Sequence, residues 1–225
     1  MIPAMKKFAY RFLALAVAIY CLLALPSVLL LLQSEYYRFQ TWQELVRKTD
    51  NIVPTEYFFC GDSITASGRN WGLLLGLNPL LTLNQALTGA YIAQVEDQVE
   101  KAVSGKPKLI SIMAGTNDVY REDFSVQVAS NDFQKIFSII SKHPDISFLI
   151  TSVPESKSGA QHDRIEALNS LIKQQASLNR NVQYIDLNAA LAGYQHDRDN
   201  LYEDDVHLSP EGIALWADLI RSRLQ

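Results

Sequence analysis

From residue 55 onward, short runs of apolar residues alternate with longer segments in which apolar residues recur every three or four positions. The short runs are typical of buried strands, and the longer spacing is typical of helices with one buried face. The pattern predicts strands at 56–60, 80–83, 109–113, 146–153 and 182–187. It predicts helices at 92–103, 124–142, 164–178 and 210–224.

This alternation also predicts the fold class. Strands separated by helices of ten or more residues pair in parallel, because each helix carries the chain back across the sheet. We therefore expect an α/β domain, a three-layer α/β/α sandwich around a parallel five-stranded sheet. In such sheets, ligands bind beyond the carboxyl ends of the strands, so the chemistry is expected at that edge.

The first part of the chain has a different pattern. Residues 12–32 contain no charged side chain, and a helix needs about 20 such residues to cross a bilayer. Lys6, Lys7 and Arg11 precede this stretch, and the next positive charge is Arg38. By the positive-inside rule, we expect a single-pass transmembrane helix, a cytoplasmic N-terminus and an exported domain, either periplasmic or extracellular.

Two other interpretations of this segment are open. A cleaved signal peptide shares the basic start and would leave a secreted protein, but the end of the apolar stretch, LLQS at 31–34, lacks the small residues of a cleavage site. A buried core helix would have a polar face, which this segment lacks. We expect three parts: a membrane anchor at 1–33, a connector at 34–54 and the α/β domain at 55–225.

Composition and charge narrow the function classes. A hydrophobic content of 48% and a charged content of 20% are typical of a folded domain. The net charge of -4 gives no support for a nucleic-acid partner. With only Cys21 and Cys60 present, we expect neither a disulfide framework nor a metal site built on cysteine. His196 has no second histidine at ligand spacing, and His162 is expected at the surface.

Three short motifs follow the first three predicted strands. Gly61-Asp62-Ser63 follows the first, Gly89 lies in the loop after the second, and Asn117 lies in GTND at 115–118 after the third. A serine at a strand end can expose a nucleophilic hydroxyl. A glycine can offer an unobstructed backbone N–H, and an asparagine amide can donate to an oxyanion. Each motif alone is equally typical of an ordinary cap or turn.

A fourth motif, Asp204-Asp205-Val206-His207, precedes the last predicted helix. A nucleophilic serine needs a base to take its proton, and the base needs a carboxylate to fix its tautomer. His207 with Asp204 can supply both within one loop, and Asp205 is a second candidate for the carboxylate. Glu203 and Asp205 also fit a simpler description, charges on a solvated loop, and we expect that role for them.

In order and spacing, the four motifs resemble the blocks of the SGNH (GDSL-type) hydrolases, an esterase and lipase-like family. The resemblance covers about 55–225 and includes the sequence HLSPEG at 207–212. Asn169 resembles a further recurrent position. Ile64 stands where the family usually has Leu, and Ala86 where many members have Gly, and neither change removes a motif residue. The resemblance implies a flavodoxin-like sheet.

The resemblance also implies the site. Ser63, Asp204 and His207 would form a catalytic triad, and the Ser63 and Gly89 backbone N–H groups with the Asn117 side chain would form an oxyanion hole. The expected activity is hydrolysis of carboxylic esters through an acyl-enzyme, without a cofactor or a metal ion. An O-acyltransferase with the same triad and a catalytically silent binding module are the alternatives. We expect a small-molecule, lipid or glycan ester as substrate, and a membrane contact through the N-terminal helix.

Overall fold

The computed structural model describes residues 54–224. Within this range, five strands form one sheet in the order β2-β1-β3-β4-β5, and all neighbouring strands pair in parallel. Since parallel strands share a direction, all five carboxyl ends lie at the same edge. The strands are β1 (Tyr57–Gly61), β2 (Thr82–Asn84), β3 (Leu109–Met113), β4 (Ser147–Thr151) and β5 (Val182–Ile185).

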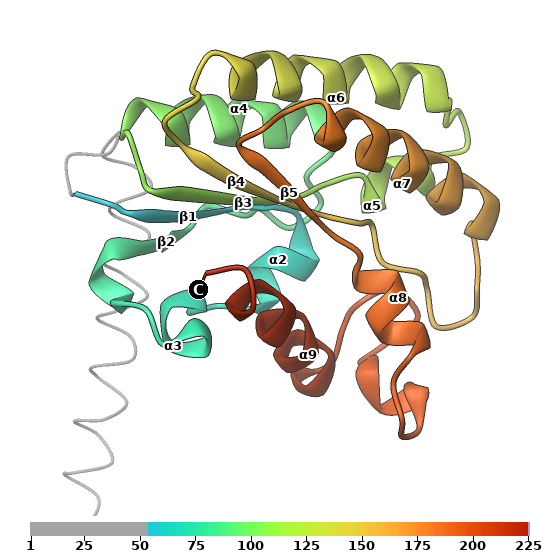
Figure 1. Cartoon of the computed structure of the whole chain (residues 1–225). Helices are drawn as coiled ribbons and strands as arrows, with labels where there is room; N and C mark the ends of the chain where they lie inside the picture. Colours follow the sequence, from blue (N-terminus) through green and yellow to red (C-terminus); the bar gives the residue numbers. More distant parts are fainter. Residues whose placement is uncertain (1–53, 225) are drawn as a thin grey trace, which may run out of the picture. The chain divides into compact units, whose positions relative to one another are not determined.

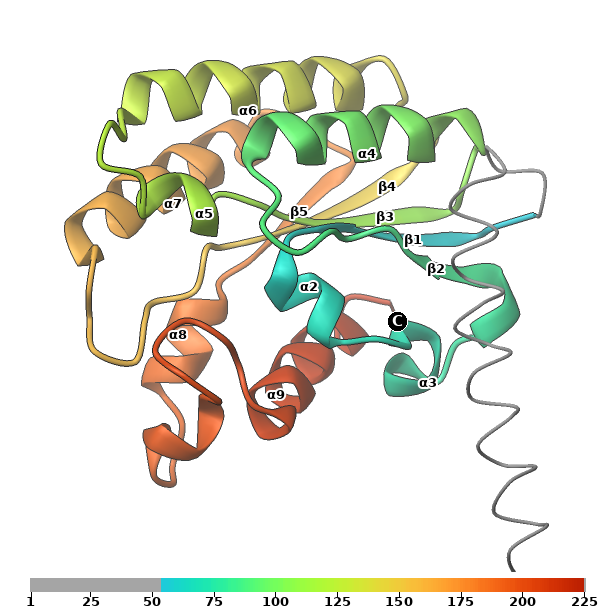
Figure 2. The same cartoon turned by 180° about the vertical axis from the view of Figure 1, so that it is seen from behind.

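Helices cover both faces of this sheet (Figures 1 and 2). The short helix α5 (Thr116–Val119) and two 3₁₀ turns, η1 (Pro79–Leu81) and η2 (Arg198–Leu201), lie in the connections. One face carries α4 (Ile92–Ser104), α6 (Val126–Ser141) and α7 (His162–Ser177), and the other carries α2 (Ser63–Ser67), α3 (Trp71–Leu75), α8 (Leu187–Ala192) and α9 (Pro210–Arg221). The predicted three-layer α/β/α arrangement is thus confirmed for the described residues.

The predicted transmembrane helix at 12–32 lies outside the described residues, as does the connector except for residue 54. Within 54–224, no helix combines the length and the apolar character that crossing a bilayer requires. The division of the chain at residues 33 and 54 therefore stays a prediction.

Three aromatic side chains join the sheet to the helices on the α9 face. Phe59 of β1 stacks on Trp71 of α3, with ring centroids 4.8 Å apart, and Trp71 meets the edge of Trp216 of α9 at 4.8 Å. Both indoles are fully buried, and each N–H has a partner: Trp71 donates to the Thr65 carbonyl (3.0 Å) and Trp216 to Thr151 Oγ1 (3.1 Å). Buried aromatic pairs of this kind contribute about 0.5–1.5 kcal/mol beyond the area they bury.

Three predicted strands are shorter than expected: β4 covers only Ser147–Thr151 of 146–153, and at the other two, capping residues start helical turns. Asn78 caps η1 and Pro79 is its first residue, so only the end of the stretch predicted at 80–83 belongs to β2. Asp186 caps α8, so β5 ends at Ile185 rather than at 187. In both places a local hydrogen bond from a backbone N–H to the oxygen of the cap side chain outweighs the apolar pattern.

Candidate active site

The turn after β1 presents Ser63 at the carboxyl edge of the sheet. Gly61 ends the strand, Asp62 caps α2, and Ser63 is the first helical residue. The Asp62 side chain accepts the backbone N–H of Ile64 at 2.9 Å, which fixes the direction in which the helix leaves the strand. The strand-to-helix turn therefore determines where the Ser63 hydroxyl lies.

Gly61 occupies a space too small for any other residue. An added Cβ would lie 2.2 Å from Thr65 Oγ1 and 2.6 Å from the Met113 carbonyl oxygen. Gln98 of α4 accepts the Gly61 N–H (2.8 Å) and donates to its carbonyl (3.0 Å). Both backbone groups are thus paired inside the core, where an unpaired one costs about 1–3 kcal/mol.

Three of the predicted site residues form one hydrogen-bonded line. Ser63 Oγ lies 2.9 Å from His207 Nε2, and His207 Nδ1 lies 2.8 Å from Asp204 Oδ2. With the ring proton on Nδ1, His207 donates to the carboxylate, and Nε2 is left to accept from the serine hydroxyl. This arrangement can remove a proton from Ser63 and hold it on the imidazole.

The Asp204 carboxylate accepts hydrogen bonds with both oxygens. The N–H groups of His207 (2.7 Å) and Val206 (2.8 Å) donate to Oδ1, and the His207 ring lies at Oδ2. These contacts, the His207 N–H first, lower the pKa of Asp204 to about 2. Asp204 is therefore ionised at neutral pH, as a partner of an imidazolium must be.

An open depression surrounds this line of side chains. Its ionisable lining consists of two carboxylates and His207, and no lysine or arginine takes part in it. The depression is open to solvent. It is lined by Ser63, Ala66, Ser67, Thr88, Glu203, Asp204 and His207.

Gly89 and Asn117 are brought together by contacts between their own segments. Gly89 has a left-handed φ of 79°, which suits glycine, and it follows the Thr88 that lines the depression. Asn117 Nδ2 donates to the carbonyl of Ala90 (2.9 Å), the residue after Gly89. Asp118 supports the same loop by accepting the N–H of Ile92 (3.0 Å). The Gly89 loop is thus fixed by the helix that carries Asn117.

Asp205 is exposed, as expected, but it also has a hydrogen-bond partner that was not expected. Its carboxylate is not merely solvated, because it accepts the Ser158 N–H (2.8 Å) and hydroxyl (3.0 Å). Glu203 is exposed, as expected, and lines the depression. His162 is exposed, as expected. It is the first residue of α7, and its Nδ1 lies 2.9 Å from Glu155 Oε1.

Sequence reasoning missed two amide side chains that hold the backbone near the site. Gln98 interrupts the apolar face on which Val95 lies, and an amide in that position is a usable signal of a buried hydrogen bond. Asn188 donates to the Val153 carbonyl (2.9 Å) and accepts the Glu155 N–H (2.7 Å). Its sequence neighbours give no sign of these distant partners.

Comparison with known families agrees with this geometry. The sequence pattern of the GDSL-like lipase/acylhydrolase family matches residues 59–215, which contain all four motifs. The chain belongs to this family. It is a hydrolase that acts on esters, and the resemblance on which the predicted site rests is confirmed. Among curated proteins, no match to this hydrolase was found.

Several solved structures share the fold of this GDSL-type hydrolase. A GDSL-like lipase from Bacteroides thetaiotaomicron has a TM-score of 0.64 at 18% identity, over 84% of this chain and 96% of its own. A lipase/acylhydrolase from Enterococcus faecalis has a TM-score of 0.63 at 19% identity, over 76% and 95%. An acetylxylan esterase from Geobacillus stearothermophilus has a TM-score of 0.60 at 19% identity, over 75% and 93%.

Asp62 of the hydrolase is a buried carboxyl group next to the nucleophile turn. Its side chain is fully buried, and this burial raises its pKa to about 6, against the lowering effect of the Ile64 N–H. In the unfolded chain its pKa is near the ordinary value of 3.8. Folding therefore favours the protonated form, and ionisation of Asp62 costs stability as the pH rises from about 4 to 6.

We predict that Asp62→Asn makes the hydrolase more stable than the wild type above pH 6. Asparagine keeps the oxygen that caps α2 but carries no charge. Because one pKa unit corresponds to about 1.4 kcal/mol, the difference should approach 3 kcal/mol, and it should vanish near pH 4. Urea denaturation of both proteins at pH 4, 5, 6 and 7 measures it. Parallel stability curves across this range would contradict the role given to burial.

Proposed function

We propose that this hydrolase cleaves carboxylic esters through an acyl-enzyme on Ser63, with His207 as base and Asp204 as its partner. The observation that carries the proposal is the unbroken hydrogen-bonded line from Ser63 Oγ through His207 to the Asp204 carboxylate. The ionised carboxylate keeps a proton on Nδ1, so Nε2 is free to act on the serine.

The reaction would proceed in two steps. Ser63 Oγ attacks the ester carbonyl while its proton passes to His207 Nε2, which gives a tetrahedral intermediate. His207 then donates that proton to the leaving alcohol, and the acyl group stays on Ser63. Water then attacks the acyl carbonyl while its proton passes to His207. His207 returns that proton to Ser63 Oγ as the Ser63–acyl bond breaks and the free acid leaves.

The negative oxygen of the tetrahedral intermediate needs hydrogen-bond donors. We assign this role to the backbone N–H groups of Ser63 and Gly89 and to the side chain of Asn117. In favour of this assignment, the bond from Asn117 to Ala90 uses one of its two amide hydrogens and leaves the other to donate. Removal of one such donor typically costs about 10²–10³ in turnover.

The substrate would be a small-molecule, lipid or glycan ester. The open depression at Ser63 supports a bulky or polymeric alcohol part, since nothing in its lining encloses a ligand. A fold relative from Geobacillus stearothermophilus is an acetylxylan esterase, so glycan esters are worth testing early. An acceptor alcohol in place of water would turn the same acyl-enzyme into an O-acyltransferase.

We also propose that residues 1–33 anchor the protein in a membrane, with 34–54 as a connector to the hydrolase domain at 55–225. The uncharged stretch at 12–32 and the basic residues before it support this topology, in which the hydrolase domain is exported. A membrane-tethered esterase would act on substrates at or near the cell envelope.

Ser63→Ala should reduce kcat for a short-chain acyl ester by about 10⁴-fold or more, because no other group can form the acyl-enzyme. Ser177→Ala, which removes an exposed hydroxyl from α7, is the matched control and should keep wild-type activity. Steady-state kinetics and labelling by a serine-reactive organophosphonate measure the effect. Wild-type turnover by the Ser63→Ala protein would show that Ser63 is not the nucleophile. A wild-type protein that neither hydrolyses the ester nor reacts with the organophosphonate would favour a binding module.

Asn117→Ala should reduce kcat by about 10²–10³ and leave measurable activity, because the two backbone donors remain. KM should change less than kcat, since the contact is made mainly in the transition state. Steady-state kinetics with the same ester measure both constants. Unchanged kcat would remove Asn117 from the oxyanion hole.

For the membrane anchor, we expect the full chain to stay in the membrane pellet after an alkaline carbonate wash. Val17→Arg combined with Leu23→Arg should release it, because a central arginine costs about 2.5–3.5 kcal/mol in membrane insertion. Gln33→Arg, beyond the apolar stretch, should stay in the pellet. A shortened wild-type protein in the soluble fraction would instead indicate a cleaved signal peptide.

A further inference from the structure

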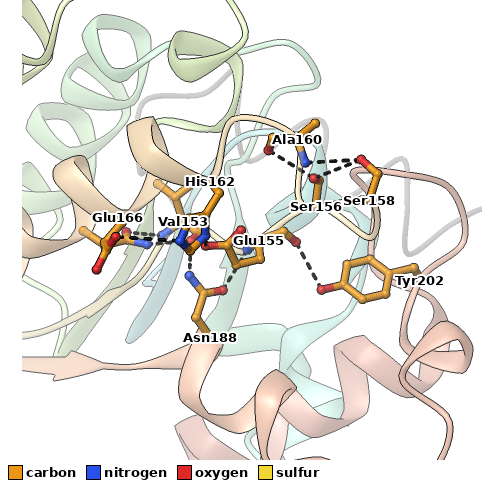
Figure 3. Close-up of polar contacts among 10 residues, drawn as sticks. Val153, Glu155, Ser156, Ser158, Ala160, His162, Glu166, Asn188 and Tyr202 are labelled. Atoms are coloured by element: carbon orange, nitrogen blue, oxygen red, sulfur yellow. Dashed lines mark hydrogen bonds and ion pairs between the residues drawn. The ribbon is translucent and has the colours of Figure 1, made fainter.

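The loop from β4 to α7, residues 152–161, is fixed at its root from both faces of the sheet. On one face, Asn169 of α7 donates to the Val153 carbonyl (2.8 Å) and accepts its N–H (2.7 Å). On the other, Asn188 of α8 donates to the same carbonyl (2.9 Å) and accepts the Glu155 N–H (2.7 Å), as Figure 3 shows. Four side-chain hydrogen bonds therefore hold the root of this β4–α7 loop.

The tip of the β4–α7 loop is closed by its own hydrogen bonds (Figure 3). The Gly159 N–H donates to the Ser156 carbonyl (3.1 Å), and the Ser156 hydroxyl donates to the Ala160 carbonyl (3.1 Å). The Ala160 N–H donates to Ser158 Oγ (3.2 Å). These bonds give the tip a fixed shape and leave the N–H of Lys157 and both donors of Ser158 to bond elsewhere.

All three of these donors bond to Asp205. The Lys157 N–H donates to the Asp205 carbonyl (2.8 Å), the Ser158 N–H to Oδ1 (2.8 Å) and the Ser158 hydroxyl to Oδ2 (3.0 Å). Asp205 directly follows Asp204, so the contact is made within the loop that carries the proposed base and its partner.

The loop that carries Asp204, Asp205 and His207, residues 202–208, is called the His loop, and it is also held at its base. Tyr202 and Leu208 form an antiparallel bridge, and the Glu203 N–H donates to the His207 carbonyl (2.9 Å). The Tyr202 hydroxyl donates to the Glu155 carbonyl at 3.1 Å (Figure 3). The β4–α7 loop thus contacts the His loop at two points: Glu155 bonds to Tyr202, and the tip of the β4–α7 loop bonds to Asp205.

We propose that Asp205 is a positioning residue for the reaction. Through Ser158 it fixes the His loop to the β4–α7 loop, and this keeps His207 aimed at Ser63 and in contact with Asp204. The inference rests on the proposed acyl-enzyme mechanism. Asp205 touches no reacting atom and acts only through the loop.

The need for such an anchor follows from how little packing holds the proposed base. The side chain of His207 is 36% exposed and that of Asp204 57% exposed. Exposed loops with few buried contacts open at low free-energy cost. Because a misplacement of about 1 Å can cost up to 10²-fold in rate, the hydrogen bonds to Asp205 supply the order that burial does not.

A set of variants separates this positioning role from a simple effect of charge. Asp205→Ala removes the carboxylate. Ser158→Ala keeps the charge of Asp205 and removes one of the two Ser158 groups that donate to it. Ser158→Thr keeps the hydroxyl and is the rescue variant. Asp163→Asn neutralises an exposed aspartate in the first turn of α7 and is the control for charge. The readouts are kcat and KM for a short-chain ester and the rate at which an organophosphonate labels Ser63.

Asp205→Ala should lower kcat and the labelling rate together by about 10- to 100-fold, with KM within about twofold of the wild type. Ser158→Ala should lower kcat by a smaller factor. The double variant that combines Asp205→Ala with Ser158→Ala should be no slower than Asp205→Ala alone, because both changes break the same contact. Ser158→Thr and Asp163→Asn should match the wild type.

Each failure has a distinct appearance. A wild-type protein that the organophosphonate does not label means that the acyl-enzyme mechanism itself is wrong. A labelled wild type together with Asp205→Ala labelled at the same rate overturns the positioning role, as does a double variant in which the two effects multiply. If Asp205→Ala does not fold, Ser158→Ala decides: a lower kcat at unchanged KM supports the role, and wild-type kcat overturns it.

Discussion

The site depends on one hydrogen bond between side chains 144 positions apart, from Ser63 to His207. No local preference of the chain can bring these residues together. The parallel sheet does so, because every strand ends at the same edge and the connections start there. The packing of Phe59, Trp71 and Trp216 then holds β1, α3 and α9 in one cluster on the α9 face. The reactive geometry is thus a product of the whole domain.

The architecture and the convergence of the site were predictable from the sequence for a physical reason. Buried strands and amphipathic helices produce different apolar periods, so their alternation determines the class of fold. Gly61-Asp62-Ser63 after a strand favours a sharp turn into a helix, because glycine allows the turn and aspartate can cap the helix. His207 with an aspartate three residues before it can form a paired unit within one loop, and the structure shows that pairing.

The supporting hydrogen bonds could not be predicted in the same way. Gln98, Asn188 and Asp205 all bond to backbone groups more than 30 residues away, and sequence neighbours carry no information about such partners. A carboxylate in a polar loop has the same sequence pattern whether it meets water or two donors of Ser158. Capping by Asp186 has the opposite character, since its partner lies three residues away, and yet the apolar pattern of the strand concealed it.

The openness of the depression around Ser63 also bears on how an acyl-enzyme would partition. Bulk water would reach such an open site directly, so water would be the first candidate to release the acyl group. An alcohol acceptor would have to be held in place to compete with water. If an acyl-enzyme forms on Ser63, the openness that would admit a large ester would also favour its hydrolysis, because water would compete with any acceptor alcohol at the second step.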